Sequence, residues 1–368
     1  MQTKKSLLSL AFLSLSATII NPQPAEAGSF QGLGYLPGLE DRSSAEDVSA
    51  NGTIVVGVSS ASGVSSSFIW TQQAGLRQIP VDDFFVGAIS DNGRVVTGSR
   101  NGNSEILRWN PSEGVTVIGP EGFADSVSFN GSTIVGFTGN FTATSAAFRW
   151  TATEGLVDLG FSDPSLEFSS GSGAAVDVSA DGSAIVGFSG DSQTGALIPI
   201  RWTEATGPTR LSIDGESANI FGAAANISAN GRFIVGFGGD INNNTGGEAI
   251  LWTGQRSFGF GDLENGTGIS IAYDLSDNAS VIVGASTSIA GQPFGDSIIF
   301  NGQPQEAFIW QPRLGMRSLK TVLTNDYGLD LTGWTLLVAT SVSTDGSTIV
   351  GTGINPQGKE EAWVANLD

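Results

Sequence analysis

A short phrase, Ser-x-(Asn/Asp)-Gly followed five residues later by a second Gly, occurs seven times along this chain. The copies begin at Ser49, Ser90, Ser128, Ser179, Ser228, Ser276 and Ser343, and in the sixth copy Ala279 replaces the first Gly. Repetition at this period is typical of stacked or radially arranged units, each too small to bury its own apolar face. The sequence therefore predicts a repeat protein.

Each unit has the pattern of four short strands. A small residue stands four positions before the Ser in six of the seven units, and the units start near residues 45, 86, 124, 175, 224, 272 and 339. The repeated phrase predicts a hairpin turn, because Asn and Asp bond to the local backbone and Gly accepts positive φ. An unbroken apolar stretch such as Ile54-Val55-Val56 then indicates a strand covered on both faces. A segment that ends in Trp and a segment that begins with Gly complete the unit.

Four strands in each of seven units predict an all-β protein, a seven-bladed β-propeller of four-stranded antiparallel blades. The last unit supplies three strands, and residues 30–34 are expected to provide its fourth, which would close the ring and remove exposed sheet edges. A parallel β-helix is the competing architecture. The intervals between copies, 41, 38, 51, 49, 48 and 67 residues, vary too much for coils of constant rise. The interval from Gly284 to Gly346 could also hide a degenerate eighth unit.

The N-terminal segment predicts export. Residues 1–27 combine Lys4 and Lys5, an apolar run and an Ala25-Glu26-Ala27 site, which is the pattern of a cleaved signal peptide. The run is too short to span a membrane, so residues 28–368 are expected to form a single propeller domain, secreted or periplasmic, without an anchor. Since the chain has no Cys, it has no disulfides. A net charge of −20 argues against nucleic acid and membranes as partners. We expect a monomer.

The frame of small residue, Ser-x-Asp-Gly, Ile-Val-Gly and Ala-Phe-x-Trp resembles the bacterial extracellular repeat family named for its His-Ala-Phe (HAF) tripeptide. The C-terminal stretch carries the most specific part of the resemblance, with Ser343-Thr-Asp-Gly346, Ile349-Val-Gly351 and Glu361-Ala-Trp363. The resemblance implies a secreted, propeller-like protein and no established catalytic residues. The position of the family's His is occupied by other residues: Ser66, Glu105, Ala146, Ile198, Glu248, Glu306 and Glu361.

The composition removes most catalytic chemistry. Without His or Cys, the usual triads, cysteine nucleophiles and zinc or haem ligation are excluded, and no catalytic residue is predicted. Paired carboxylates are the remaining catalytic option. The candidates are acids that break the repeat or lie where a loop could reach a channel mouth: Asp82, Asp83, Asp158, Asp163, Glu167, Asp274 and Asp296. Solvated loop acids are the competing interpretation.

Two loops, 291–304 and 321–334, interrupt the repeat pattern and are predicted to carry binding residues. Trp334 lies outside the repeat phase, and together with Phe294, Asp296 and Arg313 it marks a predicted binding surface formed by the loops 291–304 and 321–334. Calcium is the ion that the chain could hold, through Asp240 and Asp262, although neither stretch has the spacing of a dedicated calcium loop. No other cofactor is expected. The repeated Trp are predicted to be core, and the Arg-Trp pairs to be structural or stacked.

Two functions of different classes remain open. The leading hypothesis is an exported, non-enzymatic binding or scaffold module for an extracellular polysaccharide or an envelope protein. The alternative is a polysaccharide-active hydrolase or lyase that uses carboxylates at the channel mouth. A plain component of an extracellular matrix is a third interpretation.

Overall fold

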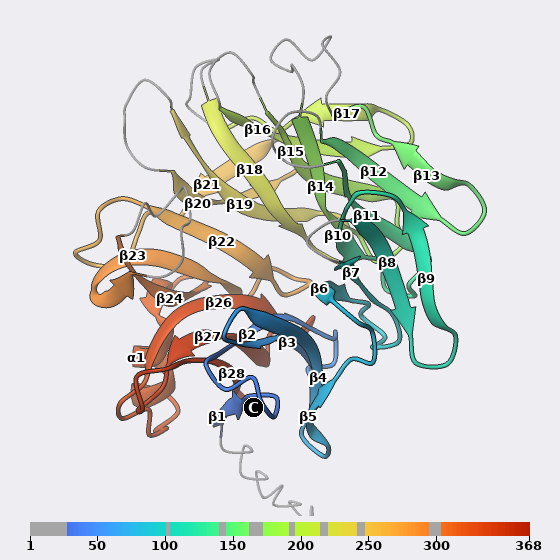
Figure 1. Ribbon diagram of the computed structural model, residues 1–368. Coiled ribbons are helices and arrows are strands. Elements are labelled where there is room, and N and C mark those ends of the chain that lie inside the picture. Colours follow the sequence, from blue (N-terminus) through green and yellow to red (C-terminus); the bar gives the residue numbers. More distant parts are fainter. Residues whose placement is uncertain are drawn as a thin grey trace, which may run out of the picture.

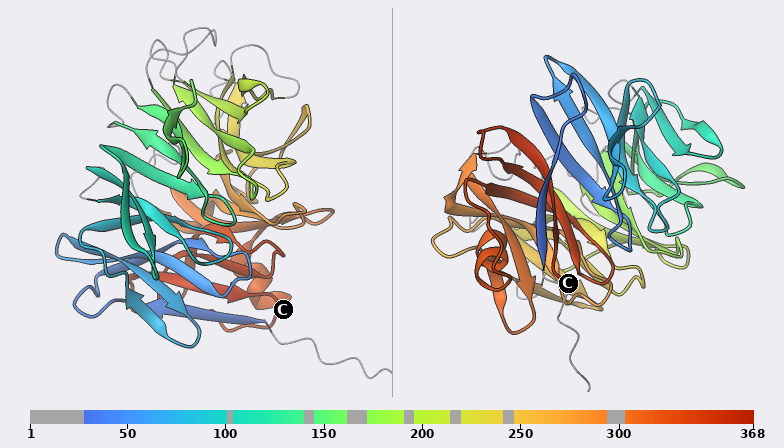
Figure 2. Two further views of the ribbon diagram at one scale, coloured as in Figure 1. Left: turned by 90° about the vertical axis from the view of Figure 1, so that its right-hand side faces the viewer. Right: turned by 90° about the horizontal axis from the view of Figure 1, so that it is seen from below.

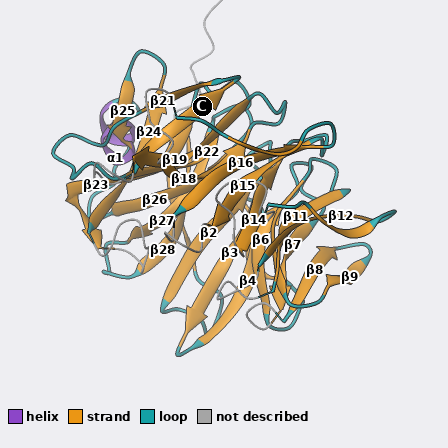
Figure 3. Ribbon diagram, turned by 90° about the horizontal axis from the view of Figure 1, so that it is seen from above, coloured by secondary structure: helices purple, strands orange, loops and turns teal. Residues whose placement is uncertain are grey.

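The computed structural model describes residues 28–100, 104–139, 145–161, 172–190, 196–213, 220–240, 247–293 and 303–368. Within these residues the chain consists of β-strands and one short helix, α1 (Leu319–Asn325), as Figure 3 shows. The predicted all-β class is therefore confirmed. The predicted signal peptide, residues 1–27, lies outside the described residues.

The strands recur in one order in every unit. The first strands are β2 (Arg42–Val48), β6 (Phe84–Ile89), β10 (Gly122–Val127), β14 (Ser172–Val178), β18 (Ile220–Ile227), β22 (Ser270–Leu275) and β26 (Thr335–Val342). The second strands are β3 (Ile54–Ala61), β7 (Val96–Arg100), β11 (Thr133–Thr138), β15 (Ala184–Gly190), β19 (Phe233–Asp240), β23 (Ile282–Pro293) and β27 (Thr348–Ile354). The third strands are β4 (Val64–Thr71), β8 (Glu105–Asn110), β12 (Ala146–Thr151), β16 (Leu197–Thr203), β20 (Glu248–Thr253), β24 (Pro304–Gln311) and β28 (Glu360–Asn366). The fourth strands are β5 (Gly75–Gln78), β9 (Gly114–Gly119), β13 (Gly155–Asp158), β17 (Gly207–Arg210), β21 (Arg256–Gly259) and β25 (Gly315–Ser318), and β1 (Ser29–Gly34) takes this place in the last unit.

Consecutive strands pair antiparallel within each unit, and the first strands lie nearest the centre of the molecule (Figure 1). The second to sixth units each form a four-stranded sheet. The first and last units share an eight-stranded sheet, in which a single parallel residue pair, Arg42 with Glu360, joins them. Strand β1 pairs antiparallel with β28, with Ser29 opposite Asn366. The two ends of the described chain therefore lie side by side (Figure 2).

Each first strand has a β-bulge at the same place. In the first unit the register shifts between Ala45 and Asp47, and the same shift occurs at the matching position in the other six units. The second Gly of the repeated phrase, here Gly57, lies opposite Ala45. A Cβ on Gly57 would lie 2.1 Å from the carbonyl oxygen of Ser44. Only Gly allows the two strands to approach so closely, and the bulge redirects the side chain that follows it.

The repeated phrase forms the predicted hairpin turns. In the fourth unit Ser179 Oγ donates to Asp181 Oδ1 (2.8 Å) and accepts a hydrogen bond from the backbone N–H of Ala184 (3.0 Å). Gly182 has a φ of 76°, and Ala279, which replaces Gly in the sixth turn, has a φ of 53°. The assignment of turn chemistry to this phrase is therefore confirmed.

Apolar side chains fill the spaces between consecutive units. Val55 and Phe68 of the first unit form one cluster with Val350 and Ala362 of the last, and similar clusters lie between the other consecutive pairs. Backbone hydrogen bonds also join neighbouring turns. Ala50 N–H donates to Asp91 O and Thr344 N–H donates to Ala50 O, each at 3.1 Å. The turn of the last unit is thus hydrogen-bonded to the turn of the first.

The described part of the long interval from Gly284 to Gly346 consists largely of strands and one helix. It holds β23, β24, β25, α1 and β26. Helix α1 buries Leu319, Val322 and Leu323 in the apolar cluster between the sixth and seventh units. The predicted recognition loop 321–334 therefore contributes to the core at its helical end. No helix among the described residues is long and apolar enough to cross a membrane.

Candidate functional site

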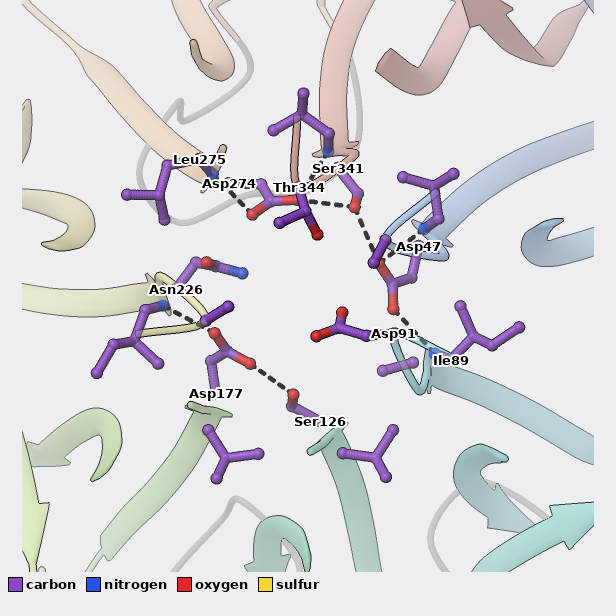
Figure 4. Close-up of a pocket in the computed structure, with 18 of the residues that line it drawn as sticks. Asp47, Ile89, Asp91, Ser126, Asp177, Asn226, Asp274, Leu275, Ser341 and Thr344 are labelled. Atoms are coloured by element: carbon purple, nitrogen blue, oxygen red, sulfur yellow. Dashed lines mark hydrogen bonds between the residues drawn. The ribbon is translucent and has the colours of Figure 1, made fainter. Parts of the chain in front are cut away.

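The seven first strands each bring one side chain to a central cavity. The residue that follows each bulge, two positions before the Ser of the repeated phrase, lines this cavity: Asp47, Ala88, Ser126, Asp177, Asn226, Asp274 and Ser341. The cavity has a volume of about 230 Å³, and every unit contributes to its wall. Figure 4 shows the side chains of Asp47, Ser126, Asp177, Asn226, Asp274 and Ser341 around its centre, each from the end of a different first strand. The bulge aims these side chains inward, so the local strand geometry positions the site.

Three aspartates of this ring, Asp47, Asp177 and Asp274, join neighbouring units. Each accepts a hydrogen bond from a backbone N–H of the next unit: Ile89 to Asp47 (2.9 Å), Ile227 to Asp177 (2.8 Å) and Val342 to Asp274 (2.7 Å). A buried N–H that loses its acceptor costs about 1–3 kcal/mol. These three carboxyl groups therefore stabilise the contacts between neighbouring units in the centre of the fold.

Serine hydroxyls complete the ring. Ser126 Oγ donates to Asp177 Oδ1 at 2.5 Å. Ser341 Oγ lies 2.9 Å from Asp47 Oδ1 and 2.8 Å from Asp274 Oδ2. A hydroxyl has one hydrogen and can donate to only one of two carboxylates at a time. Both contacts are hydrogen bonds only if one of the two carboxyl groups is protonated.

Burial makes protonation of these acids easier. Loss of water raises the pKa of Asp47 to about 6 and that of Asp177 to about 7, although the hydrogen bonds to each carboxylate act in the opposite direction. Burial also raises the pKa values of Asp125 and Asp274 well above the usual carboxyl range. Burial therefore favours the protonated form of both carboxyl groups that Ser341 contacts.

Four further acids line the cavity, namely Glu46, Asp91, Asp125 and Asp277. Burial raises the pKa of Asp91, and the negative charge of Asp277 adds to this effect. Asp125 Oδ2 is buried and has no hydrogen-bond partner among the described residues. The described residues that line the cavity include no Lys or Arg. The described wall of the cavity therefore gathers carboxyl groups without a basic side chain beside them, and a proton or a cation would relieve the repulsion between those that are ionised.

The predicted calcium ligands do not form a recognisable metal site. Within the described ranges, no group of three or more His, Cys, Asp or Glu side chains is arranged to hold a metal ion. Asp262 Oδ2 accepts a hydrogen bond from the backbone N–H of Gly268 (2.7 Å). Asp240 is the last residue of β19, and its side chain lies outside the described part. Calcium binding stays a prediction.

Two of the predicted binding residues, Trp334 and Arg313, are described by the structure and lie outside the cavity wall. Trp334 packs edge to face on Phe30, with ring centroids 5.1 Å apart, and it contacts the apolar cluster that also holds α1. Arg313 is exposed in the turn between β24 and β25, with a φ of 68°. Phe294 and Asp296 lie outside the described residues. Neither Trp334 nor Arg313 lines the central cavity.

Of the acids considered for catalysis, Asp274 lies in the cavity wall. Asp82, Asp83 and Asp158 are exposed in or beside turns and do not line the cavity. The remaining candidates lie outside the described residues: Asp163, Glu167 and Asp296. The sequence predictions omit Asp47 and Asp177. The signal for both is the recurrence of Asp, Asn or Ser two positions before the Ser of six of the seven copies.

The sheet arrangement matches solved β-propellers. The β-propeller domain of the Trilobed protease from Pyrococcus furiosus aligns over 88% of this chain and 94% of its own, with a TM-score of 0.55 and 11% identity. The β-propeller domain of Myceliophteria thermophila Cps50 (Swd1) aligns over 88% and 96%, with a TM-score of 0.50 and 10% identity. The fold is a β-propeller. Hydrazine synthase of Kuenenia stuttgartiensis also aligns with this propeller over 86% and 94%, with a TM-score of 0.50 and 11% identity.

At such identities the similarity concerns the fold alone. No family model and no curated protein matches the sequence of this propeller. The resemblance to the HAF repeats therefore stays a prediction.

Proposed function

We propose that this propeller is an exported, non-enzymatic binding module with seven blades, and that its acidic central cavity receives a positively charged group of an extracellular or envelope partner. The closed seven-bladed ring is supported by the seven repeat units, by β1 as the fourth strand of the last unit, and by the hydrogen bond from Thr344 to Ala50. Export is supported by the predicted signal peptide.

One observation carries the binding proposal. The cavity collects carboxyl groups from several units, and no cation accompanies them among the described lining residues. Buried carboxylates without a counter-charge are costly, so a cation that enters the cavity gains energy by relieving this cost. An ammonium or guanidinium group is favoured over a metal ion, because the described acids lack a metal-ligating arrangement while such groups carry several N–H donors.

The same geometry argues against a hydrolase in this cavity. A catalytic carboxyl group must exchange protons or form a covalent bond without dismantling the fold. Asp274, the described candidate for the enzymatic alternative, holds the backbone N–H of Val342 and contacts Ser341. Asp47 and Asp177 are held in the same way. These acids hold neighbouring units together through hydrogen bonds and have fixed positions, as the wall of a preformed binding cavity requires.

The test uses residues 28–368 and three small probes in calorimetric titrations: N-acetyl-lysine methylamide, N-acetyl-arginine methylamide and the neutral N-acetyl-glutamine methylamide. We expect one of the charged probes to bind and the neutral probe to fail. The double variant Asp91→Asn with Asp277→Asn should abolish binding, since it removes two cavity charges but leaves the ring aspartates intact.

The matched control is Asp83→Asn with Glu264→Gln, which removes two exposed charges outside the cavity. Equal loss in both double variants would assign binding to the overall charge of the propeller and overturn the cavity site. If neither charged probe binds, the cavity site is also overturned. A parallel titration with calcium chloride, and competition between calcium and the bound probe, would identify a metal as the occupant instead.

A further inference from the structure

A second hollow lies outside the central cavity, on the face formed by the hairpin turns, between the second and third units. It has a volume of about 730 Å³, which is within the range of small-molecule sites. Its walls come from β8, β9 and the turn between them, and from two turns of the third unit that include Asn130 and Thr153. None of these residues lines the central cavity, so the two hollows are separate.

Trp150 gives this groove an aromatic wall. At the matching position of other units, Trp70, Trp109 and Trp252 are buried, with 4%, 7% and 2% of their surface exposed. Trp150 is half-buried: it packs against an apolar cluster between the second and third units and also lines the groove. Part of its indole is therefore available for contact.

At the next interface, between the third and fourth units, a cation covers the matching Trp. There the guanidinium of Arg149 lies over the ring of Trp202, 5.5 Å from its centroid, and occupies the face that a ligand would use. Arg108 holds the corresponding position in the second unit, where its Nη1 donates to Glu113 Oε2 in the following turn at 2.6 Å. Arg149 pairs in the same way with the Glu five residues after it. No cation lies over Trp150 among the described residues. The two arginines thus differ in one respect: only Arg149 also lies over the Trp of the following unit, while the corresponding face of Trp150 has no such cover from a described residue.

The polar lining of the groove is neutral overall. Arg108 and Glu113 compensate each other, and the Arg108 side chain is only 15% exposed. Thr116 and Thr153 add exposed hydroxyl groups. Asn130 Oδ1 accepts from the N–H of Ser132, and its Nδ2 has no partner among the described residues. Donors and acceptors therefore surround an aromatic face without a net charge.

We propose that this groove binds a neutral oligosaccharide, with one sugar ring against Trp150 and its hydroxyl groups bonded to Thr116, Asn130 and the Arg108–Glu113 pair. A sugar ring combines an apolar C–H face with hydroxyl groups that both donate and accept, which matches an indole beside amide and hydroxyl side chains. An anionic ligand would find Arg108 already paired and would be repelled by a chain of net charge −20. A cationic ligand would find Glu113 paired, and a purely apolar ligand would leave the polar lining unsatisfied.

The experiment is a calorimetric titration of residues 28–368 with four neutral hexasaccharides: cellohexaose, laminarihexaose, maltohexaose and hexa-N-acetylchitohexaose. We expect at least one to bind. Ala152→Trp places a large side chain in an exposed turn of the groove wall and should weaken that binding by tenfold or more through steric exclusion. Trp150→Phe should weaken it by about threefold to tenfold, because it reduces the stacking surface.

Trp202→Phe is the matched control, since Arg149 covers that ring, and it should leave the affinity within about twofold of the original. Asp91→Asn with Asp277→Asn should also leave sugar binding unchanged, which separates this site from the cavity. Thermal unfolding of each variant establishes that it is folded. No binding by any of the four sugars at millimolar concentration would overturn the proposal. So would undiminished binding by Ala152→Trp, or equal losses for Trp150→Phe and Trp202→Phe.

Discussion

Asp177 and Asp181 lie four residues apart in the fourth unit, yet their surroundings shift their pKa values in opposite directions. Asp177 follows the bulge and lines the cavity, where burial raises its pKa to about 7. Asp181 lies in the hairpin turn, where hydrogen bonds from Ser183 and Ser179 lower its pKa. The turn is a local structure that its own residues complete. The centre depends on groups that other units supply, such as the N–H of Ile227.

The two regions also differ in the substitutions that the repeats themselves contain. The first Gly of the phrase, in the turn, is replaced by Ala279 in one unit, and the turn forms with a φ of 53°. The second Gly, beside the bulge, is present in all seven copies. A local turn can absorb strain at one residue, whereas the bulge is confined by the backbone of the adjacent strand. The centre is therefore expected to be the less tolerant region.

Two glycines of the fifth unit provide the sharpest test of this difference. In Gly236→Ala the new Cβ would lie 2.0 Å from the carbonyl oxygen of Ala223, so the strands must separate at the bulge. We expect a loss of about 3 kcal/mol or more in the free energy of unfolding. Gly231→Ala, in the turn, has its nearest neighbour at 3.6 Å and should cost about 1 kcal/mol for its positive φ. Urea denaturation measures both.

Equal costs at the two positions would contradict the distinction between centre and turn. Soluble expression of Gly236→Ala can be checked beside Gly231→Ala, because the two variants share one unit and one chemical change. If Gly236→Ala does not fold at all while Gly231→Ala does, the expected order of effects is upheld.

Asp177 and Asp181 should also differ in how they make the stability depend on pH. The folded-state pKa of Asp177, about 7, exceeds its ordinary value of 3.8, so between about pH 4 and pH 7 the folded protein binds more protons than the unfolded chain. The free energy of unfolding should therefore fall as the pH rises, by on the order of 3 kcal/mol between about pH 5 and pH 7 at about 1.4 kcal/mol per pH unit. Denaturant titrations from pH 5 to pH 8 measure the slope.

The variants Asp177→Asn and Asp181→Asn measure the share of each acid. Asp177→Asn removes one titrating group and should reduce the slope, even if it lowers stability at every pH. The slope that is left belongs to the other buried acids with raised pKa values, such as Asp47 and Asp274. Asp181→Asn should keep the original slope, because the lowered pKa of Asp181 confines its effect to acidic pH, where its contribution to stability is lost on protonation. A stability that rises from pH 5 to pH 8 would contradict the assignment.

The sequence predicts the turns and the all-β class because both depend on local patterns. The Ser-x-(Asn/Asp)-Gly phrase encodes its own hydrogen bonds, as Ser179 and Asp181 show. The bulge and the ring that it creates are not predicted, because the register shift appears only when the first and second strands are paired. The groove beside Trp150 is beyond sequence reasoning for a similar reason. Arg108 and Arg149 precede Trp at matching positions and each pairs with the Glu five residues later, yet only Arg149 covers the Trp of the next unit.

The smallest expected effect concerns the irregular turn of the sixth unit. Ala279 has a φ of 53°, a conformation that costs a residue with a Cβ about 1–2 kcal/mol. Ala279→Gly removes this cost, but the unfolded chain gains freedom worth about 0.4–1 kcal/mol. The difference predicts a gain of about 0.5 kcal/mol, measurable as a higher midpoint of urea denaturation with an unchanged slope. Because the side chain of Ala279 is also buried in an apolar cluster, a loss of stability would show that its packing outweighs its strain. That result would show that the sixth turn is part of the interface between units. Turn and centre would then differ less in their tolerance to substitution.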